Sequence, residues 1–189
     1  MKDDAKRVFL KNEIMLLTLN AGLATRDSDA KIYCPEASNT RKEDLKSDIR
    51  QKLAELAASY IERKVSEDEH IANIRGIADY LTEKFSDCLD RSRFRIGVSQ
   101  KLLNLYLKYL WTLGWIPEPC HCPFDRIVIE KLGDLPAAAR KWTSLDSIDD
   151  YKALVKEAKE IAKRERYSSL AVWELETYER RRKKLALDG

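Results

Sequence analysis

The sequence contains little glycine and little proline, with six and five residues in a chain of 189. Collagen-like, low-complexity and turn-rich all-β proteins need more of both residues, so these classes are excluded. Aromatic residues are also few, at 8%, whereas hydrophobic residues make up 44% and charged residues 35%. Leu, Ile, Ala and Tyr recur at regular steps despite the high charge, so we do not expect disorder of the whole chain. The composition favours a soluble, helical protein.

The sequence also lacks a long hydrophobic run. Ile14 to Leu19 is too short to span a bilayer, and acidic Asp3 and Asp4 stand where a signal peptide would be basic. We therefore expect no membrane partner. Four cysteines are too few for a disulfide framework in a chain of this length, which favours a reducing, cytoplasmic location; they are Cys34, Cys88, Cys120 and Cys122.

Apolar residues recur at three- and four-residue steps along most of the chain, which predicts α-helices. The helical stretches are residues 8–20, 45–60, 66–85, 100–113, 126–132, 135–139, 146–161 and a last one from Ser168. Residues 24–42 and 115–123 have no such period and are predicted loops. We expect one compact all-α domain over residues 1–189, with a basic C-terminal tail at 180–189.

Several helix ends are predicted from single residues. Ser66 and Glu69 form a capping box, Asp125 and Asp146 are expected N-caps, and Gly114 is an expected stop. Residues 127–129 are Ile-Val-Ile, a run that suits a strand as well as the short helix after Asp125.

Residues 91–117 contain no acidic side chain. In a chain whose 35 basic and 32 acidic residues leave a net charge of only +3, this segment is a local excess of positive charge. Such a segment attracts phosphate, and a turn around Gly97 that opens a helix would present free backbone N–H groups in the same direction. The alternative is a basic surface turn that holds neighbouring carboxylates. The basic residues are Arg91, Arg93, Arg95, Lys101 and Lys108.

The helix that follows this turn, residues 100–113, is the most apolar in the chain. Because it is apolar on most of its circumference, we expect it to be buried. Its polar residues form one narrow stripe that must reach solvent, a polar partner or a cleft. The stripe consists of Gln100, Asn104, Lys108 and Thr112 at four-residue steps, with Lys101 beside it.

The segment Gly97-Val98-Ser99-Gln100-Lys101-Leu102-Leu103-Asn104 resembles the Gly-Val-Gly-x-Lys-x-x-Asn segment of the helix-hairpin-helix DNA glycosylase superfamily. In that superfamily an aspartate follows in a Pro-x-Asp context, which Pro123-Phe124-Asp125 matches. The spacing is nearest to the archaeal 8-oxoguanine glycosylase type. Ser99 replaces the second hairpin glycine, and no four-cysteine iron–sulfur pattern follows. The resemblance covers residues 91–133 and implies a helix-hairpin-helix-like turn near residues 91–104.

The resemblance implies a base-excision DNA glycosylase and lyase without a cofactor. Lys101 would attack the anomeric carbon of the sugar and form a Schiff base, and Asp125 would stabilise the developing sugar cation. Double-stranded DNA would contact Arg91, Arg93, Arg95, Gly97, Ser99, Gln100, Asn104 and Lys108. The alternative is a non-catalytic, all-helical nucleic-acid-binding or protein-interaction protein, which needs nothing from Lys101 and Asp125 as a pair.

A zinc site is a further possibility that the spacing disfavours. Thiolate and imidazole groups are good zinc ligands, and Cys120-His121-Cys122 offers both. However, no second close pair of ligands exists, and three nearby prolines indicate a rigid connector. The sequence therefore predicts no metal, and small apolar packing for the cysteines. The residues that could complete a zinc site together with this triplet are Cys34, His70 and Cys88.

Overall fold

The computed structural model describes residues 2–25, 30–133, 135 and 137–177. These residues form seven α-helices and two short 3₁₀-helices, and within them the one sheet-like pairing is an isolated bridge between Tyr33 and Leu89. The predicted all-α class is confirmed. Within the same residues, no helix combines the length and the apolar character that a membrane crossing needs. The expected basic tail, residues 180–189, lies outside the described part.

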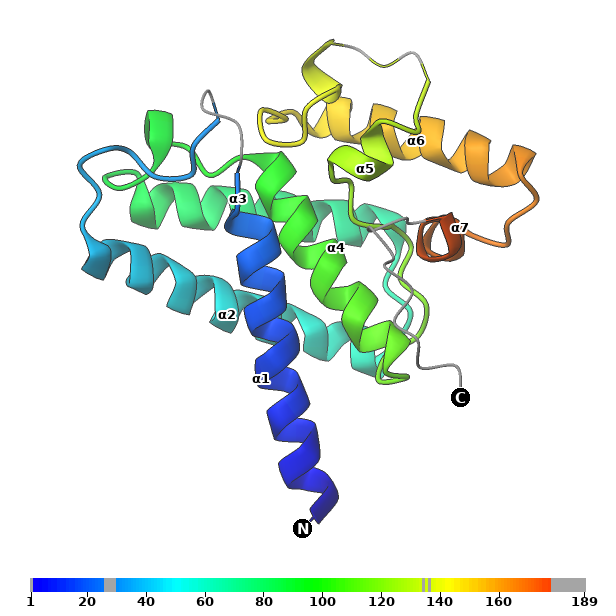
Figure 1. Cartoon of the computed structure of the whole chain (residues 1–189), viewed down its shortest axis with the longest axis horizontal. Helices are drawn as coiled ribbons and strands as arrows, with labels where there is room; N and C mark the ends of the chain where they lie inside the picture. The colour runs from blue at the N-terminus through cyan, green and yellow to red at the C-terminus, as the bar shows by residue number, and fades with distance from the viewer. Residues whose placement is uncertain (1, 26–29, 134, 136, 178–189) are drawn as a thin grey trace, which may run out of the picture.

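Helix α4 lies at the centre of the fold, between α1 on one side and α5, α6 and α7 on the other, and α3 crosses behind it (Figure 1). It packs against α1, α2, α3 and α6, and its leucines Leu102, Leu103 and Leu107 are fully buried. The predicted burial of this helix is confirmed. The elements are α1 (Lys2–Leu23), α2 (Asn39–Glu62), α3 (Glu67–Phe85), η1 (Asp90–Ser92), α4 (Ile96–Thr112), α5 (Arg126–Ile129), η2 (Ala137–Ala139), α6 (Ile148–Arg164) and α7 (Leu170–Thr177).

Three helix ends follow the sequence signals. The hydroxyl of Ser66 accepts a hydrogen bond from the N–H of Glu69 and begins α3. Gly114, with a φ of +70°, follows the end of α4 in a conformation that glycine adopts most easily. The carboxylate of Asp125 accepts hydrogen bonds from the N–H groups of Ile127 and Val128 and caps α5. The strand alternative for residues 127–129 is therefore wrong.

The predicted cap of α6 is also wrong. Ser147, not Asp146, caps this helix, because its hydroxyl accepts hydrogen bonds from two N–H groups of the first turn. The carboxylate of Asp146 instead faces the start of α4, where it accepts from the N–H of Ile96 and from the guanidinium of Arg93. Asp146 does not cap α6 because its carboxylate is bound at the start of α4 instead.

Four other helix starts differ from the prediction by a few residues. Helix α1 begins at Lys2 rather than at residue 8. Helix α2 begins at Asn39, inside the expected loop, because the hydroxyl of Ser38 accepts from the N–H of Arg41. Helix α4 begins at Ile96 and includes the turn around Gly97. The last helix follows Ser169 rather than Ser168, since the Ser169 hydroxyl accepts from the N–H of Val172.

The N-terminal half of α1 projects away from the other helices (Figure 1). Its C-terminal half packs on α4, where Gly22 lies so close to Leu102 that a side chain on the glycine would overlap it. Phe9 and Leu17 are exposed to 61% and 50% on the projecting helix. The predicted apolar stretch of residues 8–20 is therefore only partly a core element.

Candidate functional site

The side chain of Gln100 connects α4 to the loop that carries Asp125. Its amide nitrogen donates to the carbonyl oxygen of Phe124 at 2.7 Å, and its amide oxygen accepts from the N–H of Phe124 at 3.1 Å. Gln100 is fully buried, so both bonds are shielded from water. They bring the helix residue before Lys101 next to the loop residue before Asp125.

Lys101 and Asp125 have different immediate surroundings. The Lys101 side chain is 9% exposed, and its Nζ lies 3.8 Å from the centre of the Trp142 ring, within the range of a cation–π interaction. The Asp125 carboxylate is half-buried, and the two N–H groups of α5 fix its orientation. We call the two hydrogen bonds between Gln100 and Phe124 the Gln100 clamp. The buried amine of Lys101 lies one residue after Gln100, and the fixed carboxylate of Asp125 lies one residue after Phe124.

The polar stripe of α4 reaches polar partners on the neighbouring helices. Asn104 donates to the amide oxygen of Gln100 and to the hydroxyl of Tyr151 on α6. Lys108 donates to both carboxylate oxygens of Glu174 on α7, at 2.9 and 2.6 Å. Burial raises the pKa of Glu174, and the Lys108 ammonium opposes this shift. The stripe was expected to reach solvent, a polar partner or a cleft. For Asn104 and Lys108 the structure shows polar partners.

Most of the predicted basic segment is paired inside the protein. Arg93 forms ion pairs with Asp79 and Asp146, at 3.3 and 3.0 Å. Arg95 is buried, and its guanidinium lies 3.5 Å from the Asp90 carboxylate and donates to the carbonyl oxygens of residues 30 and 31. Among the five basic residues, Arg91 has the most exposed side chain, at 79%, and contacts Asp90 only at 3.9 Å. The alternative of a turn that holds neighbouring carboxylates agrees with these contacts.

The backbone at the start of α4 is not free to bind phosphate in this conformation. The N–H of Gly97 donates to the carbonyl of Leu145 at 2.8 Å, and the N–H groups of Val98 and Ser99 donate to the carbonyl of Arg95. The N–H of Ile96 is taken by Asp146. The expectation of free N–H groups at this turn is therefore wrong, because residues 142–146 occupy the place of a ligand.

The helix-hairpin-helix-like turn is not confirmed. Residues 86–95 separate α3 from α4, and they include η1, in which Arg91 and Ser92 have a φ of +52°. The hydroxyl of Ser99, at the position of the second hairpin glycine, is buried and donates to the carbonyl of Arg95. The residues expected to hold DNA thus have structural partners of their own.

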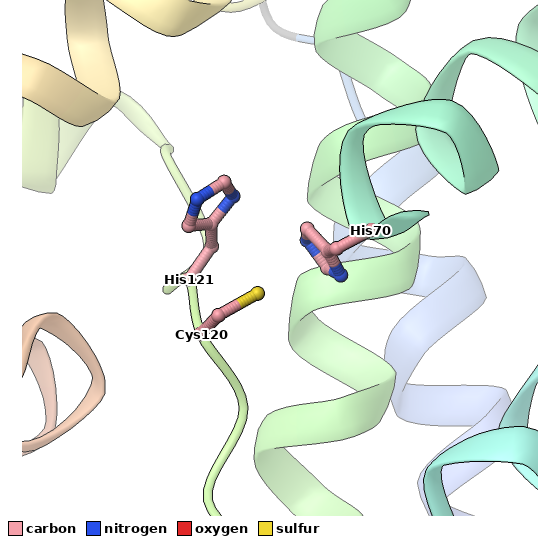
Figure 2. A group of neighbouring side chains, drawn as sticks. All are labelled: His70, Cys120 and His121. Atoms are coloured by element: carbon pink, nitrogen blue, oxygen red, sulfur yellow. The ribbon is translucent and has the colours of Figure 1, made fainter. Parts of the chain in front are cut away.

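A second group of side chains, which carry potential metal-ligand atoms, lies between α3 and the loop that precedes α5. His70, Cys120 and His121 offer ligand atoms that all lie within 4.8 Å of one another. The Cys120 sulfur points into the space between the two imidazole rings (Figure 2), whose centres are 4.8 Å apart. Within the described residues, this is the group that could hold a metal ion. It includes neither Cys34 nor Cys88, nor Cys122 of the same triplet.

Hydrogen bonds hold both imidazole rings from behind. His70 Nδ1 lies 2.8 Å from the hydroxyl of Tyr60, and His121 Nδ1 lies 2.7 Å from the hydroxyl of Tyr151. The other nitrogen of His121 lies 3.1 Å from the Glu67 carboxylate. Burial lowers the pKa of His70 to about 3 and that of His121 to about 4, so both rings are neutral at pH 7. Burial raises the pKa of the Cys120 thiol to about 11.

No protein-family model matches the chain, and no curated protein and no solved structure matches it significantly. The functional interpretation therefore rests on the residues themselves. Two places carry it: the Gln100 clamp with Lys101 and Asp125, and the group formed by His70, Cys120 and His121.

Proposed function

We propose that the chain binds DNA and excises a modified base, with Lys101 as the nucleophile and Asp125 as the residue that stabilises the sugar cation. The observation that carries this proposal is the pair of hydrogen bonds between Gln100 and Phe124. These bonds fix the part of α4 that carries Lys101 against the loop that carries Asp125. A nucleophile and a stabilising charge must be held in a fixed relation to act on the same sugar.

The proposed reaction uses the two side chains in different ways. The neutral Lys101 amine attacks the anomeric carbon, the glycosidic bond breaks, and the base leaves with the bonding electrons and takes up a proton. Opening of the sugar ring then gives a protonated imine with the lysine. The Asp125 carboxylate, fixed by two N–H groups of α5, would stabilise the positive charge that develops on the sugar.

Entry of a substrate requires a local movement. Lys101 is 9% exposed beneath Trp142, so the indole must leave the amine when a flipped nucleotide enters. An indole ring at that place offers a surface on which a base can stack. Arg91 is the predicted DNA contact with the most exposed side chain. Arg93, Arg95 and Lys108 would act by holding the turn and helix in place.

Borohydride trapping tests this proposal. The full chain is incubated with duplex DNA that carries an abasic site, or a modified base, and the imine is reduced to a stable amine. Wild-type protein should form the covalent complex, K101Q should not, and K152Q, which changes an exposed lysine on α6, should trap normally. If the wild-type protein binds DNA in a salt-sensitive manner but never traps, the non-catalytic alternative holds and the enzymatic proposal is wrong.

A further inference from the structure

His70 carries a buried nitrogen that has no hydrogen-bond partner in the described part of the chain. Its ring is fully buried, and Nε2 is the unpartnered atom. The amide oxygen of Asn104 is likewise buried and unpartnered. It lies near enough to His70 to influence its pKa without forming a hydrogen bond of good geometry. The nitrogen thus has only a poorly aligned contact with Asn104, which a stronger ligand could replace.

The space next to this nitrogen is lined by two more potential ligands. The ligand atoms of His70, Cys120 and His121 lie within 4.8 Å of one another, and Figure 2 shows the sulfur between the rings. Zinc–nitrogen and zinc–sulfur bonds in a tetrahedral site place neighbouring ligand atoms about 3.3–3.8 Å apart. Small side-chain rotations, closing the group by about 1 Å, would therefore bring all three atoms to bonding distance of one ion.

We propose that His70, Cys120 and His121 bind one zinc ion. One thiolate and two imidazoles form a donor set that suits zinc, and zinc sites with three protein ligands keep a water molecule in the fourth position. The Glu67 carboxylate lies 3.1 Å from His121 Nε2, the nitrogen that would bind the ion, and the ion would replace this hydrogen bond. Binding forms a zinc–sulfur bond and releases the Cys120 proton to solvent. The neutral His121 ring loses no net proton, but its proton moves from Nε2, where it faces Glu67, to Nδ1, which then donates to Tyr151.

The surroundings of the group resemble the outer shell of a metal site. A histidine ligand typically makes a hydrogen bond through its second nitrogen, which fixes the ring. His70 makes this bond with Tyr60, whose hydroxyl also accepts from Asn73. His121 makes it with Tyr151. Each ring is thus held in place before an ion binds.

A surface pocket reaches Cys120, one member of the group. The pocket has a volume of about 440 Å³ and is lined by Cys120 together with residues of the end of α6 and the start of α7. An ion that enters here would join the first turn of α3 to the loop before α5. Zinc would therefore fix the segment between Cys120 and the α5 cap.

Metal analysis of the untagged full chain tests the proposal. After dialysis against metal-free buffer, mass spectrometry should find about one zinc per wild-type chain. C120S and H70Q should each lose most of the metal, and C34S should keep it, since Cys34 lies outside the group. Circular dichroism of each variant shows whether it is folded.

Cobalt substitution tests the same claim without relying on variants that lose metal. Wild-type protein loaded with Co²⁺ should show a thiolate-to-cobalt charge-transfer band, and C120S should not. The proposal is overturned if folded wild-type protein loses all zinc on dialysis and gives no such band with Co²⁺. It is equally overturned if C34S loses as much metal as C120S. The unpartnered atoms would then be joined by buried water.

Discussion

Gly97 lies directly against the main chain of Trp142: a Cβ atom at this position would overlap the Trp142 carbonyl oxygen. The N–H of Gly97 also donates to the carbonyl of Leu145. A glycine that the sequence suggested for contact with a DNA backbone is therefore already required by contact with the protein's own backbone. Replacing it tests packing and function together, so stability must be measured first.

G97A should destabilise the protein by about 1–3 kcal/mol, the usual cost of forcing an extra group into a packed site. G76A is the matched control, because a Cβ at Gly76 in α3 meets nothing within 4 Å. That change should stabilise the protein by roughly 0.5–1 kcal/mol through the better helix propensity of alanine. Urea unfolding of both variants measures the difference. Equal effects would contradict the close approach of residues 97 and 142.

Q100M should cost roughly 2–4 kcal/mol, because it leaves the buried N–H and carbonyl of Phe124 without partners. The same substitution at Gln51, an exposed residue of α2 whose amide contacts Glu55, should change stability by less than about 0.5 kcal/mol. Denaturant unfolding distinguishes the two. A small effect at Gln100 would mean that the clamp does not hold the Asp125 loop.

Substitutions at Asp125 separate its structural and its proposed chemical role. D125N keeps the cap of α5, because asparagine caps helices as well as aspartate does, whereas D125A should lose about 1 kcal/mol. If the negative charge stabilises the sugar cation that forms as the base leaves, D125N should release a modified base from duplex DNA roughly a hundredfold more slowly in single-turnover assays. If D125N keeps both the stability and the single-turnover rate of the wild type, the role of Asp125 is to cap α5 and nothing more.

The two buried histidines should make the stability depend on pH. Their folded-state pKa values of about 3 and about 4 lie below the ordinary 6.5, so below pH 6.5 the unfolded chain takes up protons that the folded chain does not. Stability is therefore present above pH 6.5 and lost as the pH falls, by roughly 2 kcal/mol per histidine at pH 5. The raised pKa of Glu174 acts in the opposite direction.

These are the only two histidines in the chain. Unfolding measured between pH 7 and pH 5 in the presence of EDTA, which removes any metal contribution, checks the prediction. A flat profile over this range would show that the rings are not buried as described. H70N should show about half of the wild-type slope.

Local sequence signals predicted the parts of the fold that depend on neighbours in the chain. The burial of α4, the start of α3 at Ser66, the glycine after α4 and the cap at Asp125 each follow from residues within one or two helical turns. The cap of α6 did not follow, because Asp146 is drawn to Arg93 and Ile96 on a distant segment.

The chemical sites depend on contacts between distant segments. The internal pairing of Arg93 and Lys108 could not be read from a segment that itself contains no acid, since their partners come from α3, from the loop before α6 and from α7. The sequence likewise allowed several partners for the Cys120-His121-Cys122 triplet, and only the fold shows that His70 is the one that lies beside Cys120. The unpartnered nitrogen of His70 is visible only once the chain is folded.

The position of the trapped adduct tests the proposed mechanism most directly. Abasic sites also react with surface lysines, so trapping alone does not identify the nucleophile. The borohydride-reduced complex of the full chain with an abasic duplex is digested, and the modified peptide is sequenced by mass spectrometry. The mechanism predicts a single adduct on Lys101. Adducts spread over exposed lysines, or no adduct on Lys101 in a folded protein that binds the duplex, would contradict it.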